Sequence, residues 1–114
     1  MADIKKAYTL LAGNQIFALD CKKVQYLNPV GSVSIEPNTY YDFGTIDNIT
    51  IVKGTTKPDV VNMYIIRFIA GENLSQVVFD GWELSWVRGM TPSYNAGKIY
   101  EIIIVDNFAS YINS

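Results

Sequence analysis

Short β-prone runs, separated every few positions by turn residues, are the feature that most constrains this chain. Residues 61–70 read VNMYIIRFIA, in which both alternating sets of side chains are largely apolar. Because side chains alternate across a strand, such a run predicts a central strand or one covered on both faces. Gly, Pro, Asn and Asp recur between this run and its neighbours and predict turns. The pattern requires no helix longer than two turns and favours an all-β fold.

We predict one small β-sandwich, of the jelly-roll type, with about eight or nine short antiparallel strands. Asp80-Gly81 predicts a tight hairpin between two of them. Residues 1–12 fit either a short N-terminal helix or an extended arm. The β-prone segments are residues 15–19, 24–28, 32–36, 39–44, 46–52, 61–70, 76–80, 82–86, 98–106 and 107–112.

The length of 114 residues suits one domain with a single core. Ile and Val outnumber Leu, and there are 8 Tyr, which is typical of pleated, half-buried surfaces. Within this domain we expect residues 1–30 to hold an arm and the first strands, as a candidate attachment segment. Residues 31–114 are expected to form the β-sandwich module.

The ionisable residues argue against several classes of function. Lys and Arg number 9 against 11 Asp and Glu, so the clustered cations that nucleic acid binding requires are missing. The chain has no His, the commonest general base and metal ligand. Its one cysteine, Cys21, has no partner for a disulfide or a zinc site, and we expect no metal and no cofactor. We also expect neither a membrane span nor a secretory signal.

The stretch WVRGMTPSYNAGKIYEIIIVD, residues 86–106, joins a loop with two Gly and one Pro to a strongly β-prone run. Gly can adopt positive φ and Pro pre-sets a turn. A phosphate-binding loop would open a helix, whose N-terminus attracts the anion, whereas this loop precedes a strand. We therefore expect a structural corner with aromatic anchors at its ends, formed by Trp86, Gly89, Pro92, Gly97 and Tyr100.

Aromatic residues are the remaining candidates for binding. Exposed rings on one face could stack on sugars, whereas buried rings supply core or subunit contacts, and we favour packing. The candidates are Trp82, Trp86, Tyr94, Tyr40 and Tyr41.

Pairs of carboxylates across a cleft could hydrolyse glycosides. Glu83 and Glu101 lie on different expected strands, and Asp42 and Asp47 flank a turn. Nothing in the sequence marks either pair as buried, so we interpret all four as solvated charges and expect no catalytic residue.

Several short pieces follow one another in order between about residues 32 and 108. They are NTYYDFG at 38–44, ITI at 49–51, MYIIRF at 63–68, then Trp86, Gly89 and Pro92, and GKIYEIIIV at 97–105. Together they resemble a module of the structural proteins of tailed bacteriophages, found as small β-sandwich domains in head fibres, capsid decorations, tail fibres and adhesins. The resemblance supplies no catalytic residue. Residues 77–82 depart from the module through the extra Trp82, so a binding surface there does not carry over.

This resemblance implies a non-enzymatic virion structural protein, such as a head fibre, capsid decoration or tail-associated subunit. Its partners would be copies of itself, for example in a trimer, and other virion proteins. It would be made in the cytoplasm of the bacterial host and located in the virion. The alternative is a carbohydrate-binding adhesin or receptor-binding domain whose exposed aromatics contact a host-surface glycan.

Overall fold

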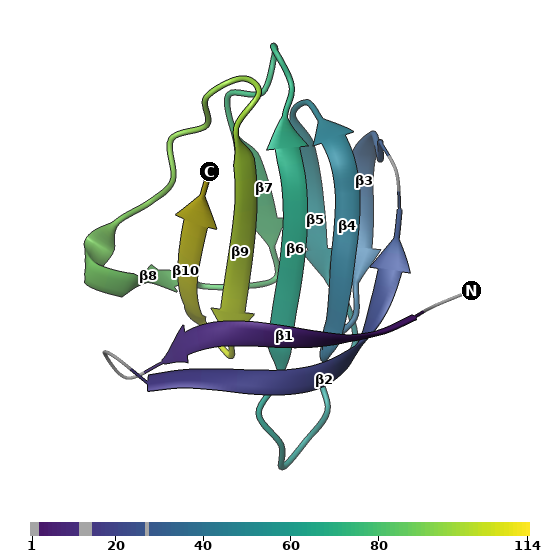
Figure 1. The fold of residues 1–114 in the computed structure, drawn as a ribbon, viewed down its shortest axis with the longest axis vertical. Coiled ribbons are helices and arrows are strands. Elements are labelled where there is room, and N and C mark those ends of the chain that lie inside the picture. Colours follow the sequence, from purple (N-terminus) through teal and green to yellow (C-terminus); the bar gives the residue numbers. More distant parts are fainter. Residues whose placement is uncertain (1–2, 12–14, 27) are drawn as a thin grey trace.

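The computed structural model describes residues 3–11, 15–26 and 28–114, and the side chains discussed below belong to residues 23–26 and 28–114. These residues are mostly β, and the strands form two sheets that lie one behind the other (Figure 1). Apart from one 3-10 turn, η1 (Val87–Gly89), the described ranges contain no helix.

Ten strands occur in the described residues, and most expected strand segments are confirmed. The strands are β1 Asp3–Leu11, β2 Gln15–Gln25, β3 Gly31–Ile35, β4 Thr39–Ile46, β5 Ile49–Lys53, β6 Met63–Ala70, β7 Val77–Asp80, β8 Ser85–Trp86, β9 Ile99–Val105 and β10 Phe108–Asn113. The two strands expected at residues 15–19 and 24–28 are one continuous strand, β2.

The seven-stranded sheet has the order β1-β2-β4-β6-β9-β10-β8, and the three-stranded sheet has the order β3-β5-β7. From β2 to β8 the chain changes sheet at every connection, so strands that return to a sheet run in the same direction. Five pairs are therefore parallel: β2–β4, β4–β6, β3–β5, β5–β7 and β8–β10. The expectation of an entirely antiparallel fold is wrong, and the antiparallel pairs are β1–β2, β6–β9 and β9–β10.

Residues 3–11 form a strand, so the short N-terminal helix is wrong. β1 pairs with β2 along its whole length, and the far end of β2 pairs with β4, which joins the N-terminal segment to the seven-stranded sheet. In Figure 1 the β1–β2 hairpin crosses in front of the lower ends of the sheet. Helical spacing of apolar residues over so short a segment is overridden by pairing with a neighbouring strand.

The hairpin expected at Asp80-Gly81 is also wrong, because β7 and β8 belong to different sheets. Gly81 has a φ of 101° and carries the chain from one sheet to the other. A two-residue hairpin turn instead joins β9 to β10 at Asp106-Asn107, where Asp106 has a φ of 54°. Asp and Asn tolerate this left-handed conformation better than most residues.

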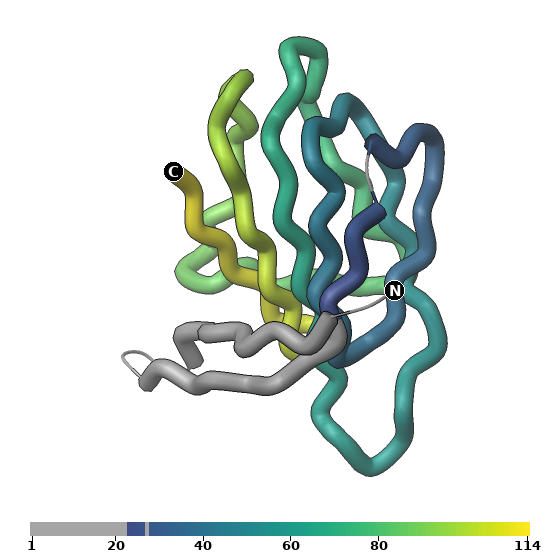
Figure 2. Tube along the Cα trace, turned by 45° about the vertical axis from the view of Figure 1, so that its right-hand side comes forward, coloured from purple at the N-terminus to yellow at the C-terminus, as the bar shows by residue number. Residues whose placement is uncertain are grey.

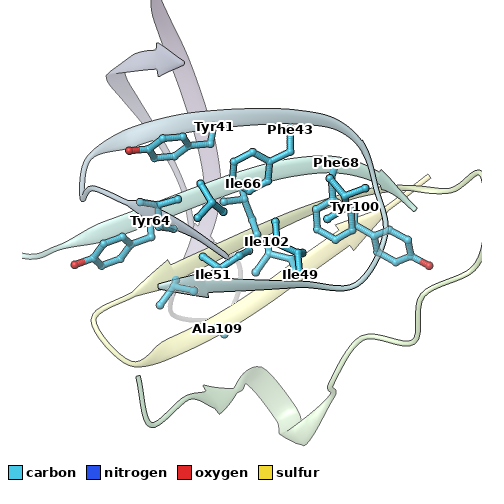
Figure 3. Packing of buried hydrophobic residues seen from close by; sticks show 14 of the residues in the cluster. Tyr41, Phe43, Ile49, Ile51, Tyr64, Ile66, Phe68, Tyr100, Ile102 and Ala109 are labelled. Carbon is cyan, nitrogen blue, oxygen red and sulfur yellow. The ribbon is translucent and has the colours of Figure 1, made fainter. Parts of the chain in front are cut away.

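The main hydrophobic core lies between the two sheets (Figure 3). It is built from the inward set of alternating side chains on β3, β5, β4, β6 and β9. The labelled members are Tyr41, Phe43, Ile49, Ile51, Tyr64, Ile66, Phe68, Tyr100, Ile102 and Ala109.

A second, smaller apolar cluster lies on the opposite face of the seven-stranded sheet. It comprises Tyr40, Met63, Ile65 and Ile103, all buried, with Val105 packed against them. Both faces of β6 are therefore covered, and its neighbours β4 and β9 complete its hydrogen bonding. The expectation that residues 61–70 hold a central strand is confirmed.

The buried centre of the three-stranded sheet should contribute much of the stability. Ile51 is fully buried on β5, whereas Val78 on β7 is 41% exposed. We expect Ile51→Ala to lower the free energy of unfolding by about 2–5 kcal/mol, because it removes apolar contacts and leaves a cavity. Val78→Ala is the matched control and should change it by less than about 0.5 kcal/mol. Denaturant unfolding measures both, and equal effects would contradict the described burial.

Candidate functional site

The segment of residues 38–44 builds the start of β4 through local hydrogen bonds. Asn38 occupies the turn before the strand with a φ of 57°. The Tyr41 hydroxyl accepts a hydrogen bond from the Glu36 N–H at 2.8 Å, which fastens the preceding turn to the strand. The Gly44 N–H donates to Asp42 Oδ1 at 3.1 Å, at an irregularity in the pairing of β4 with β6. Gly44 has a φ of 67°, a conformation that suits Gly at such a bulge.

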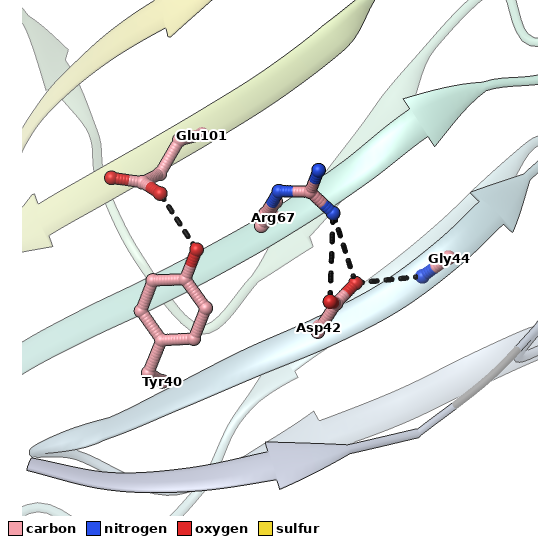
Figure 4. A network of polar contacts seen from close by, with 5 residues as sticks. All are labelled: Tyr40, Asp42, Gly44, Arg67 and Glu101. Atoms are coloured by element: carbon pink, nitrogen blue, oxygen red, sulfur yellow. Dashed lines mark hydrogen bonds and ion pairs between the residues drawn. The ribbon is translucent and has the colours of Figure 1, made fainter. Parts of the chain in front are cut away.

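A row of polar side chains crosses the outer face of the seven-stranded sheet (Figure 4). The register places Asp42 of β4 beside Arg67 of β6, and Arg67 beside Glu101 of β9. Arg67 Nη1 lies 3.4 and 3.5 Å from the two carboxylate oxygens of Asp42. The Tyr40 hydroxyl donates to Glu101 Oε2 at 2.7 Å. The row therefore links three neighbouring strands beside the smaller apolar cluster.

The two carboxylates of this row are poorly arranged for acid–base catalysis. Asp42 and Glu101 are two strands apart, which corresponds to about 10 Å between their backbones. The Arg67 side chain lies between them in Figure 4. A glycosidase needs one protonated and one ionised carboxyl group on either side of a substrate cleft. Here each carboxylate is already bound to the side chain of a residue on another strand, so the row links the strands to one another.

The two carboxylate pairs considered from the sequence are not paired in the structure. Glu83 lies in the exposed connection between β7 and β8, whereas Glu101 bonds to Tyr40. Asp47 lies beyond the end of β4, where its Oδ1 accepts the Asn73 N–H at 3.3 Å. The acidic residues that the structure places in one row are instead Asp42 and Glu101, on either side of Arg67. Sequence reasoning missed this pair because it depends on the order of β4, β6 and β9.

The loop from β8 to β9 is a corner held by hydrogen bonds to one tyrosine. The Tyr100 hydroxyl accepts from the Asn95 N–H at 2.7 Å and donates to the Ser93 carbonyl at 2.9 Å. Gly89 and Gly97 take φ values of 67° and 82°. The Gly97 N–H donates to the carbonyl of Ala70, which attaches the end of the loop to the end of β6. This loop, residues 87–98, is called the corner loop below.

An aromatic cluster packs beneath the corner loop. The Tyr100 ring stacks on Phe68 at 5.6 Å and meets Tyr94 edge to face at 5.1 Å. Trp86 contacts Tyr111 at 6.3 Å, and Tyr111 in turn lies 6.4 Å from Tyr100. The two expected anchors, Trp86 and Tyr100, are thus joined through Tyr111 rather than directly.

The aromatic residues considered as a sugar platform lie in packing positions. Tyr40, Tyr41 and Trp82 are buried, while Trp86 and Tyr94 are half-buried against the main core. Tyr40 belongs to the cluster on the outer face and Tyr41 to the main core, so their rings point to opposite sides of β4. Ring faces that pack against each other are not open for stacking on a sugar.

A shallow hollow of about 170 Å³ lies where β3, β5 and β7 begin, and it is lined by Gly31, Asn48, Ile49, Thr50, Gln76 and Val78. This volume is below the about 300 Å³ at which ligand pockets begin. Among the residues with described side chains, no group of three or more His, Cys, Asp or Glu could hold a metal ion. Within the described ranges, no helix is long and apolar enough to traverse a bilayer.

The most exposed apolar side chains of the C-terminal strand were not identified from the sequence. Phe108 is 66% exposed and Ile112 is 65% exposed, both on β10 at one margin of the seven-stranded sheet. The alternation of residues 107–112 predicts two different faces but not which of them is covered. Val87 in η1 and Met90 directly after it are also at least half exposed, and η1 contacts this strand. The geometry therefore offers an apolar strand margin as the candidate surface for contact with a partner.

Comparisons of this chain with protein families, with curated proteins and with solved structures give no match.

The hydroxyl of Tyr100 should stabilise the corner loop. We expect Tyr100→Phe to lower the free energy of unfolding by about 1–3 kcal/mol and to speed hydrogen exchange at the Asn95 amide, because two hydrogen bonds are lost while the ring packing stays. Tyr111→Phe is the control, because it removes a hydroxyl from another ring of the same cluster and leaves the two hydrogen bonds of Tyr100 in place. Unchanged exchange at Asn95 in Tyr100→Phe would contradict the role of the hydroxyl.

Alkaline pH should unfold this protein through its buried tyrosines. Burial raises the pKa of Tyr40, Tyr41, Tyr64 and Tyr94, and at Tyr40 the hydrogen bond to Glu101 adds to the effect. Unfolded tyrosines lose their protons near pH 10, so above this pH the unfolded state binds fewer protons than the folded state. The contribution to stability is complete below about pH 10 and is lost as the pH rises further.

Denaturant unfolding between about pH 8 and about pH 11 measures this loss. Tyr94→Phe removes one of these groups and should make the decline shallower. A free energy of unfolding that stays constant across this range would show that the buried hydroxyls do not keep their protons.

Proposed function

We propose that this chain is a non-enzymatic structural subunit of a phage virion, of the head fibre, capsid decoration or tail-associated type. It acts by association with copies of itself and by docking on other virion proteins, in the virion. In this proposal the two sheets make up one small β-sandwich. Residues 1–30, which include the β1–β2 hairpin, provide the attachment segment.

The observation that carries this proposal is that the residues of the phage-like pieces are occupied in supporting the fold. Tyr41 and Tyr100 each use the hydroxyl to fasten a neighbouring turn or loop. Asp42 binds Arg67 and the Gly44 amide. The resemblance therefore concerns how a rigid β body is built, which is what an assembly subunit needs. Function is argued from the site rather than from the fold, and in these pieces the polar side chains support the backbone instead of forming a reactive group.

The exposed margin of the seven-stranded sheet supports assembly. Strand edges present backbone N–H and C=O groups that can pair with another chain. Here β10 carries two exposed apolar side chains, Phe108 and Ile112, beside such an edge. Small β subunits of virions can associate through contacts of this kind. The burial of Tyr40, Tyr41 and Trp82 makes the alternative of an aromatic sugar platform the weaker proposal.

Mass spectrometry of purified particles of the phage that encodes this chain tests the proposal. We expect its peptides in intact particles, in constant ratio to the other structural proteins. A glycan titration by calorimetry provides the control, because binding of a sugar would favour the adhesin alternative. Absence of the chain from particles would overturn the assignment to the virion.

A further inference from the structure

Only every second residue of β10 points its backbone N–H and C=O groups toward β9. Ile99 and Ser114 exchange both N–H···O bonds, each at 2.9 Å, so they form a hydrogen-bonded pair of the antiparallel ladder. In such a ladder hydrogen-bonded pairs recur every second residue. The register then makes Ile112 with Glu101, and Ser110 with Ile103, hydrogen-bonded pairs as well.

The residues in between, Tyr111 and Asn113, point their backbone N–H and C=O groups away from β9. On that side β8 pairs only with Phe108 and Ala109. Among the described strands none pairs with β10 beyond this point. Figure 1 shows the C-terminal part of β10 at the side of the sheet, and the turned view of Figure 2 shows it again at the margin of the body. Two N–H and two C=O groups are thus available at one open edge.

Open strand edges usually carry charged residues or Pro that prevent pairing with another chain. The segment of residues 107–114 reads NFASYINS and contains neither. Its outward side chains include Ile112, which is 65% exposed. Other apolar side chains that are at least half exposed lie nearby, outside the residues that would pair: Phe108 earlier on β10, and Val87 in η1, which contacts β10.

We propose that the open edge of β10 pairs with the same edge of a second copy, antiparallel and across a two-fold axis at Ile112. This inference deepens the proposed function, on which it rests, by naming the surface through which copies associate. In this register Tyr111 pairs with Asn113 of the second copy, and Asn113 with its Tyr111. All the outward N–H and C=O groups of both copies are then used in four hydrogen bonds.

A second copy of this chain is the partner at this edge, because two β10 segments can pair with each other. Ile112 lies opposite the same residue of the other copy in a non-hydrogen-bonded pair, where side chains approach most closely. The contact is between two apolar side chains, and no charge in residues 107–114 opposes it. β8 limits the pairing to the residues after Ala109, which fixes this register rather than one centred nearer the start of β10. The same patch serves both copies, as a two-fold interface requires.

Charge substitutions at the axis test the register directly. We expect light scattering to give the mass of two chains for the native protein, and of one chain for Ile112→Glu alone and for Ile112→Lys alone. Like charges directly opposite each other destabilise a strand pair, whereas opposite charges stabilise it. An equal mixture of the two variants should therefore regain the mass of two chains. Val78→Glu and Val78→Lys are matched controls on an exposed strand position of the other sheet, and each should keep the native mass.

Cross-linking provides a second measurement that does not depend on affinity. In a Cys21→Ser background, Ile112→Cys should form a disulfide between two chains on mild oxidation. Cα atoms of a non-hydrogen-bonded pair are about 4.5 Å apart, within the range that a disulfide spans. Phe108→Cys in the same background is the control and should remain reduced, because Phe108 has no partner across this interface.

The outcomes separate this inference from the proposed function. A native mass of one chain at every concentration, a mass of three chains, or a mass of two chains that persists in both Ile112 variants would overturn the β10 pairing. None of these results bears on the proposal that the chain is part of the virion. The assignment to the virion fails separately, if the chain is absent from purified particles.

Discussion

β6 can be buried on both faces only if apolar side chains gather on each side of the seven-stranded sheet. On the inner side the layer is the three-stranded sheet, whose Val33, Ile35 and Ile51 pack against the inward side chains of β4, β6 and β9. On the outer side lie Tyr40, Met63, Ile65 and Ile103, which are buried although they face away from the other sheet. From β2 to β8, each passage of the chain to the other sheet and back adds one strand to each sheet. The parallel pairing is the consequence of this winding.

The polar contacts stabilise the places where this winding changes direction. Tyr41 fixes the turn into β4, Asn48 accepts the backbone amides of Ser75 and Gln76 before β7, and Tyr100 fixes the corner loop before β9. In each case a side chain satisfies backbone groups that no strand can pair with at a turn. These contacts explain why polar and aromatic residues occur at set positions between the strands.

The strands themselves could be predicted from the sequence, because alternation is a local property. Residues 61–70 and 98–106 each contain a strand, β6 and β9, as expected. The sheet to which a strand belongs could not be predicted, since Asp80-Gly81 has the composition of a hairpin but connects two sheets. For the same reason the neighbourhood of Asp42, Arg67 and Glu101 became evident only once the order of β4, β6 and β9 was known. The corner at residues 86–100 could be predicted as a turn, whereas the hydrogen bonds of Tyr100 could not.

The strand order also sets distances in an assembly, because the part of β2 that pairs with β4, Lys22–Gln25, and β10 lie toward opposite margins of the seven-stranded sheet. β2 and β10 are separated by β4, β6 and β9, which amounts to about 19 Å at the usual spacing of strands. Two copies joined through β10 would hold the paired ends of their β2 strands about 40 Å apart along one continuous sheet. The backbone hydrogen bonds of that sheet would then fix the separation of the two β2 ends.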